Sequence, residues 1–111
     1  MQINLNSNER LVKEGPANLQ RGWETVGGSL KLTDQRLVFD SHGFNVQTGA
    51  TEIPISSITG TRPVWTKFLG FLPLFPNSLA VTAGDKQYNF VVGNRRDWAA
   101  AISRQISRAG A

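Results

Sequence analysis

Residues 26–40, VGGSLKLTDQRLVFD, are the stretch that decides the class of fold. Apolar and polar residues alternate over 26–33 and again over 36–40, which is the two-residue period of half-buried strands. The Asp-Gln pair at 34–35 separates the two runs and predicts a tight turn. The stretch therefore predicts an antiparallel hairpin whose inward face is made by Val26, Gly28, Leu30, Leu32, Leu37 and Phe39.

Short apolar runs punctuated by Gly, Pro, Asn or Asp continue on both sides of this hairpin. A Gly-Pro pair at 15–16 interrupts the first run and indicates an edge strand or a bulge. Residues 41–50 contain two glycines and predict a longer loop. Further strands are expected at residues 11–19, 52–55, 58–61, 79–82 and 88–92, of which the last two form a second hairpin.

After residue 93 the period becomes helical. Asn94 predicts the N-cap, with Asp97 as its capping-box-like partner, and Gly110 predicts a left-handed C-terminus. The apolar side of this helix consists of Trp98, Ile102, Ile106 and Ala109. About seven antiparallel strands followed by one helix predict a mainly β fold, a partly open barrel that the helix plugs through its apolar side.

The composition excludes several classes of protein. A chain of 111 residues, 40% hydrophobic and 18% charged, suits one soluble domain, which we expect at 9–109 behind a flexible segment at 1–8. There is no cysteine, so disulfides and thiolate metal sites are excluded. Neither a secretory leader nor an apolar run of roughly 20 residues is present, so we expect a cytoplasmic protein.

The residue types needed for catalysis do not come together in this sequence. His42 is the sole histidine, and in a strand Ser41 would point away from it, so no nucleophile–base pair follows. Scattered acids do not make a metal site. The glycines at 27–28 lack phosphate-loop spacing and indicate close packing or a bulge. We therefore expect no enzyme, no metal and no cofactor.

The net charge of +4 is concentrated in the second half of the chain. Residues 1–55 hold five Lys/Arg and six Asp/Glu, whereas residues 56–111 hold seven and two. This asymmetry indicates an anionic partner. Nucleic acid is not expected, because the cations do not interleave with sheet-face aromatics as base stacking requires. Candidate anion-binding residues on the predicted helix are Arg95, Arg96, Arg104 and Arg108.

These helix arginines have two interpretations. Exposed arginines commonly form no more than a solvated helix face. Arg95 and Arg96, however, lie in the first turn, where the helix dipole disfavours cations. Either nearby carboxylates or an anionic partner would compensate for that cost.

Residues 62–76, RPVWTKFLGFLPLFP, form the most unusual segment. The segment is too long for a tight turn and is expected to be a loop. It either folds back to complete the core, because large exposed apolar patches are uncommon, or forms a contact surface for a bilayer or a protein. Loops at 20–25 and 41–50 would lie at the same end. The candidate contact residues are Arg62, Trp65, Lys67, Phe68, Phe71, Leu72, Phe75, Trp23 and Phe44.

Residues 15–19 and the pattern Gly-Gly-x-Leu-x-Leu-Thr-x-x-Arg-Leu-x-Phe at 27–39 resemble the signature of the GRAM domain family. Residues 53–58, 90–92 and Trp98 continue the resemblance, which covers 9–109. It implies a pleckstrin-homology-like fold, seven strands in two nearly orthogonal sheets capped by a C-terminal helix. It also implies binding of lipids or proteins without catalytic residues. Specific phosphoinositide recognition does not carry over, because Arg21 is the only cation of the first hairpin loop.

The function expected from these patterns is that of a non-catalytic binding module. The segment at 62–76 would associate peripherally with an anionic membrane surface or lipid. The alternative is a protein-interaction or self-association domain, including a homo-oligomer, that uses the same segment.

Overall fold

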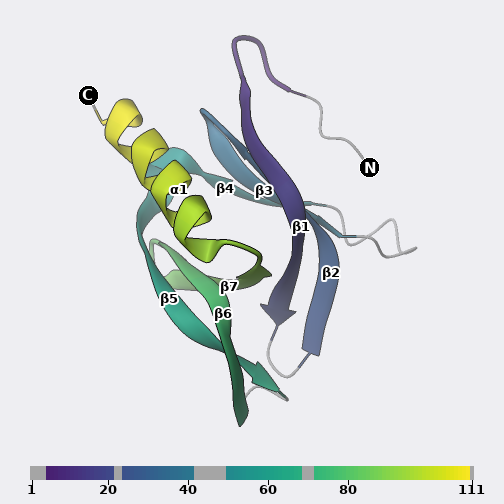
Figure 1. The fold of residues 1–111 in the computed structure, drawn as a ribbon. Coiled ribbons are helices and arrows are strands. Elements are labelled where there is room, and N and C mark those ends of the chain that lie inside the picture. Colours follow the sequence, from purple (N-terminus) through teal and green to yellow (C-terminus); the bar gives the residue numbers. More distant parts are fainter. Residues whose placement is uncertain (1–4, 22–23, 42–49, 69–71, 111) are drawn as a thin grey trace.

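The computed structural model describes residues 5–21, 24–41, 50–68 and 72–110, with the side chains of 21, 24, 65–68 and 72–77 excepted. Within these residues the chain forms seven strands, a short 3-10 helix and one α-helix (Figure 1). The elements are β1 (Leu11–Arg21), β2 (Glu24–Thr33), β3 (Arg36–Ser41), β4 (Ala50–Pro54), η1 (Ile55–Ser57), β5 (Ile58–Phe68), β6 (Leu72–Ala83), β7 (Lys86–Val92) and α1 (Arg95–Ala109).

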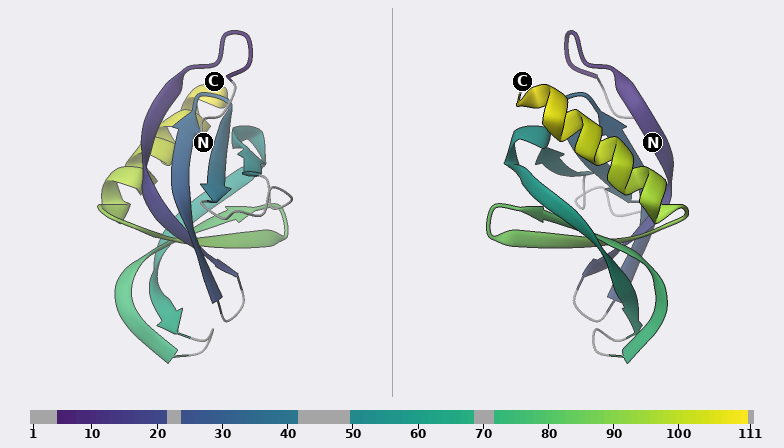
Figure 2. Two further views of the ribbon diagram at one scale, coloured as in Figure 1. Left: turned by 90° about the vertical axis from the view of Figure 1, so that its right-hand side faces the viewer. Right: turned by 60° about the vertical axis from the view of Figure 1, so that its left-hand side comes forward.

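The strands pair in the order β4-β3-β2-β1-β7-β6-β5, and every neighbouring pair is antiparallel. β1 pairs with β2 along its length and with β7 over Ala17–Gln20, so it joins two halves that cross steeply (Figure 2). The predicted mainly β fold is confirmed. The two expected sheets form one continuous sheet that bends at β1, with β4 and β5 at its edges.

The hairpin predicted at 26–40 is confirmed in its register. Leu30 pairs with Phe39 and Leu32 with Leu37, and all four side chains are at most 1% exposed. The Phe39 ring lies 5.9 Å from that of Phe90 on β7, which links the two halves of the sheet through the core. A Cβ atom at Gly28 would lie 2.2 Å from the backbone oxygen of Asp40, so glycine is required there for close packing.

Helix α1 has the predicted cap residues, Asn94 and Gly110, but neither adopts the predicted capping conformation. Asn94 adopts a left-handed conformation (φ = 53°) and its side chain makes no cap hydrogen bond. Side-chain capping requires an extended N-cap residue, whereas the chain turns sharply here from β7 into the helix. Gly110 has φ = −87°, an ordinary right-handed conformation, and its N–H donates to the carbonyl of Ile106.

The buried side of α1 confirms Trp98 as a core anchor. Trp98 is 3% exposed and Ile102 is fully buried, whereas Ile106 is half-buried and Ala109 is exposed. The last turn of the helix therefore extends past the core that its first three turns cover.

The expected loop at 62–76 is wrong, because these residues largely belong to a long β5–β6 hairpin. Val64 pairs with Ser78, and Phe68 pairs with Leu72, with register shifts on either side of Thr66. β6 pairs with β7 only from Ser78 onward, and Ser78 is the partner of Val64, so residues 65–68 and 72–77 form a two-stranded ribbon that projects from the sheet (Figure 1). The prolines that suggested a loop are accommodated by the register shifts between β5 and β6 and by the absence of a third described strand beside residues 72–77.

Candidate functional site

Of the candidate contact residues at 62–76, the structure describes the side chain of Arg62. It is exposed on β5, and its Nη2 donates to Oε1 of Gln87 on β7 at 3.2 Å. Gln87 in turn donates to Asn89 at 2.9 Å, so a polar chain crosses the sheet at the base of the ribbon. The backbones of Trp65, Lys67, Phe68, Leu72 and Phe75 belong to the ribbon, and their side chains lie outside the described residues, as do Phe71, Trp23 and Phe44.

Arg95 ties the start of α1 to the base of the ribbon. Its Nη1 donates to the carbonyl of Val64 at 2.8 Å and to that of Ser78 at 3.0 Å. These two residues pair with each other immediately before the register shift in β5. The cost of a cation in the first helical turn is therefore offset by backbone carbonyls, a third possibility beside the carboxylate and the anionic partner that the sequence suggested.

The remaining helix arginines, Arg96, Arg104 and Arg108, are all exposed, and two of them line the same hollow beside β1. Arg104 and Arg108 are four residues apart and therefore lie on one flank, the flank that faces β1. Arg96, two turns before Arg104, does not line this hollow. The structure thus brings together two of the four candidates, Arg104 and Arg108.

Between α1 and β1 lies a groove that we call the β1–α1 groove. Its wider end has a volume of about 320 Å³, and an adjoining part of about 300 Å³ shares Val12 and Arg104 with it. In Figure 1 and in the right-hand view of Figure 2 the helix runs beside the N-terminal half of β1. The wider end is lined by Arg10, Leu11, Val12, Asp34, Arg104, Gln105 and Arg108, and the adjoining part by Val12, Lys13, Asp97, Ala100, Ala101 and Arg104.

The wider end of the groove carries an excess of positive charge. In the part of the chain that the structure describes, no carboxylate lies within ion-pair distance of Arg10, Arg104 or Arg108. Asp34, the one acid lining this end, accepts a hydrogen bond at 3.0 Å from the backbone N–H of Arg10. At the narrow end, Lys13 lies 5.1 Å from the centre of the Trp98 ring, a cation–π distance.

Sequence reasoning missed this groove because its two walls come from opposite ends of the chain. A local signal does exist in β1. Two adjacent apolar residues, Leu11 and Val12, follow Arg10 at the start of the strand. The structure leaves them 43% and 42% exposed. The alternation of apolar residues cannot show which side of a strand a distant helix will leave open.

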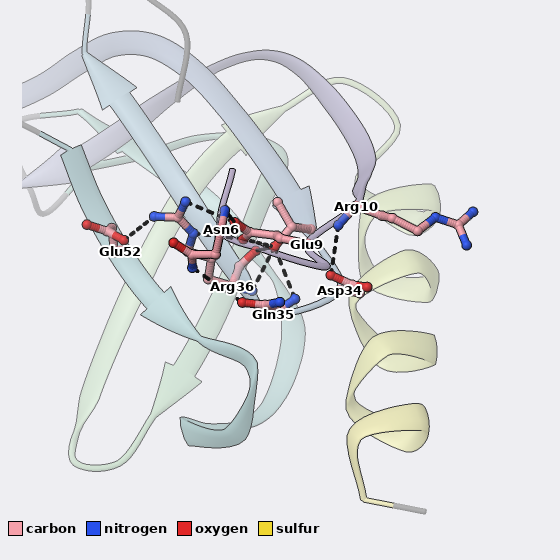
Figure 3. A network of polar contacts seen from close by, with 8 residues as sticks. Asn6, Glu9, Arg10, Asp34, Gln35, Arg36 and Glu52 are labelled. Carbon is pink, nitrogen blue, oxygen red and sulfur yellow. Dashed lines mark hydrogen bonds and ion pairs between the residues drawn. The ribbon is translucent and has the colours of Figure 1, made fainter. Parts of the chain in front are cut away.

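A second polar cluster, drawn in Figure 3, has a structural role. The buried carboxylate of Glu9 accepts hydrogen bonds from Arg36 Nε at 2.8 Å, from Arg36 Nη2 at 3.1 Å and from the Thr33 hydroxyl at 2.6 Å. Arg36 also pairs with Glu52 on β4. The cluster ties the turn before β1 to β3 and β4.

The hydrogen bonds of this cluster shift both of its main ionisable groups. The hydrogen bond from Arg36 lowers the pKa of the Glu9 carboxyl from 4.5 to about 2, against the opposing effect of burial. The hydrogen bond to Glu9 raises the pKa of the Arg36 guanidinium above its ordinary value. Both groups therefore carry their charges throughout the neutral range.

The described ranges contain no group of three or more His, Asp or Glu that could hold a metal ion. No helix within these ranges is long and apolar enough to cross a membrane.

No family model and no curated protein matches this chain. Solved structures do match it. The N-terminal PH domain of Vps36 superimposes with a TM-score of 0.70 at 14% identity, over 96% of this chain and 85% of that one. The chain has a pleckstrin-homology-like fold. The human N-terminal PH domain of ARAP2 agrees, with a TM-score of 0.67 at 16% identity over 87% of this chain and 80% of that one.

A third similar structure is larger. The PH-like chain matches the linker-DH/PH domains of p115-RhoGEF with a TM-score of 0.70 at 19% identity, over 91% of its own length but 30% of that chain. Identities this low show the fold alone. The finer resemblance to the GRAM family has no matching family model and stays a prediction.

Proposed function

We propose that this PH-like domain is a non-catalytic binding module that associates peripherally with an anionic membrane surface through the β5–β6 ribbon. The observation that carries the proposal is the projection of the ribbon beyond the sheet, where β6 no longer pairs with β7. Residues 62–76 contain four aromatic residues, two cations and no acid. A projecting segment of this composition suits the boundary between lipid headgroups and acyl chains.

The energetics favour reversible attachment. Each cation close to an anionic leaflet contributes about 1 kcal/mol, so Lys67 on the ribbon supplies about 1 kcal/mol and Arg62 at its base at most as much again, and this part weakens with added salt. Apolar contact by the aromatic residues must supply the rest. Binding should therefore need both anionic lipid and the aromatic residues of the ribbon.

Liposome co-sedimentation tests the proposal. Vesicles of phosphatidylserine and phosphatidylcholine should capture the domain, whereas phosphatidylcholine alone should capture little. Changing Trp65, Phe68 and Phe71 together to serine should abolish capture. The control is Leu5→Ser, which removes an apolar side chain that is 47% exposed elsewhere and should leave capture unchanged. Capture that is absent, or that the triple change does not reduce, would show the proposal to be wrong.

The alternative is a protein-interaction or self-association role for the same ribbon. One observation favours it: β5 is an edge strand of the described sheet, and an edge strand can pair with another chain. Light scattering coupled to size-exclusion chromatography distinguishes the two. A mass that rises with protein concentration, and that the triple change returns to the monomer value, would support self-association.

A further inference from the structure

The N-terminal half of β1 has one open edge. β1 pairs with β2 from Leu11 onward, but its pairing with β7 covers only Ala17–Gln20. Among the residues that the structure describes, no strand pairs with this edge of residues 11–16. Alternate residues of a strand direct their N–H and C=O groups to the same edge, so the segment presents backbone donors and acceptors there, except that Pro16 has a carbonyl and no N–H, and the register shifts between Leu11 and Lys13.

The open edge borders the β1–α1 groove. β7 ends at Val92 and the chain turns into α1, which runs beside this half of β1 (Figure 1). At the narrow end the two elements touch, since Trp98 approaches both Gly15 and Lys13. Six residues of open edge span about 20 Å at about 3.3 Å per residue. The edge is therefore long enough to pair with a short extended segment.

The side chains around the edge define the chemistry of such a segment. Arg10, Arg104 and Arg108 line the wider end without carboxylate partners among the described residues. Leu11 and Val12 expose more than two fifths of their surface beside them. A ligand that matches both must offer carboxylates and apolar side chains together.

We propose that the β1–α1 groove binds an acidic polypeptide segment, which adds as a short extended strand to residues 11–16 of β1. Its backbone pairs with the open edge, its acidic side chains reach Arg104 and Arg108 on the helix, and its apolar side chains contact Leu11 and Val12. A phosphate group alone would engage the arginines but would leave the strand edge and the exposed apolar pair without a role. The groove shares no residue with the ribbon, so this binding does not depend on membrane association.

Fluorescence anisotropy with four labelled octapeptides tests the proposal. In each peptide glutamate alternates with valine, leucine, phenylalanine or tyrosine, and a matched set carries lysine in place of glutamate. We expect at least one acidic peptide to bind the full chain and its lysine counterpart not to bind. N-methylation at alternate residues, made in both registers, should abolish binding in one register, because a strand needs its N–H groups on one edge to pair.

Two matched variants locate the site. Arg104→Glu and Arg96→Glu make the same substitution at exposed positions of one helix, but only Arg104 lines the groove. Arg104→Glu should weaken binding of the acidic peptide about tenfold or more, since a charge-assisted hydrogen bond is lost and a repulsion is added. Arg96→Glu should change the affinity for the same peptide by less than about twofold. Thermal unfolding of both variants confirms that the fold is retained.

Amide hydrogen exchange provides a readout independent of charge. Peptide binding should slow exchange within residues 11–16 and leave β5 unaffected. The proposal is overturned if none of the four acidic peptides binds, if both N-methylated registers bind as well as the parent, or if the two arginine variants weaken binding equally. It is also overturned if Arg104→Glu weakens binding of the domain to phosphatidylserine vesicles but not to any peptide. That result would assign the groove to lipid.

Discussion

Replacing Glu9 by glutamine removes the negative charge at the buried end of the network in Figure 3 while keeping the size of the side chain. Arg36 then loses its charged partner, and the Thr33 hydroxyl donates to a neutral amide oxygen. Because the pKa of Glu9 falls from 4.5 to about 2 on folding, the carboxylate favours the folded state. That difference sets an upper limit of about 3 kcal/mol.

The contribution measured in solution should be smaller than this limit. Arg36 retains 16% side-chain exposure, and the exposed Glu52 also competes for it, so water screens the network. We expect Glu9→Gln to lower the free energy of unfolding by about 1–2 kcal/mol at pH 7.

The pH dependence identifies the charge as the cause. A depressed carboxyl pKa gives stability that is complete above pH 4.5 and is lost as the pH falls toward 2. The difference between wild type and Glu9→Gln should therefore shrink between pH 4.5 and pH 2. Urea unfolding at several pH values measures it, because urea, unlike guanidinium, adds no salt.

Glu14→Gln is the matched control, since Glu14 is exposed on the adjoining strand β1. It should leave the free energy of unfolding within about 0.5 kcal/mol of wild type. A stability difference for Glu9→Gln that is equal at pH 7 and pH 2.5 would refute the reasoning, because it would place the effect in packing instead of charge.

Three further substitutions test the packing of the fold. Gly28→Ala should destabilise the domain by about 2–4 kcal/mol in urea unfolding, because the new Cβ atom would overlap the backbone of β3. Its control is Gly60→Ala, whose Cβ atom meets no atom within 4 Å and which should change the free energy of unfolding little. Arg95→Met should cost about 1–3 kcal/mol by leaving two carbonyls without their donor and should speed proteolysis of the ribbon, while Arg96→Met should do neither. Trp98→Ala should cost about 3–5 kcal/mol, and a thermal midpoint shifted by less than a few degrees would contradict its role as an anchor.

Local patterns predicted those elements whose partners are close in the sequence. The hairpin at 26–40 and the span of α1 follow from residue periodicity, which reports directly on which side of a strand or helix is buried. Trp98 was predicted as an anchor because its helical neighbours mark the apolar side. These features depend little on how the rest of the chain is arranged.

Predictions about ends and edges were less successful. The residue type at Asn94 suits a side-chain cap, but the path from β7 into α1 requires a left-handed residue there instead. The prolines of 62–76 are typical of a loop, yet strands that lack a third paired neighbour tolerate them. In both places the route of the chain outweighed the local preference.

The sequence by itself determined a mainly β domain with one closing helix, an excess of positive charge in its second half and the absence of cysteine chemistry. Only the tertiary structure decided that Glu9 meets Arg36, that Arg95 holds the base of the ribbon, and that Arg10 and Arg104 line one groove. The physical reason is that alternation specifies the buried face of a strand but not its neighbour. Strand order and the bend at β1 arise from contacts between residues far apart in the chain, and those contacts created the groove.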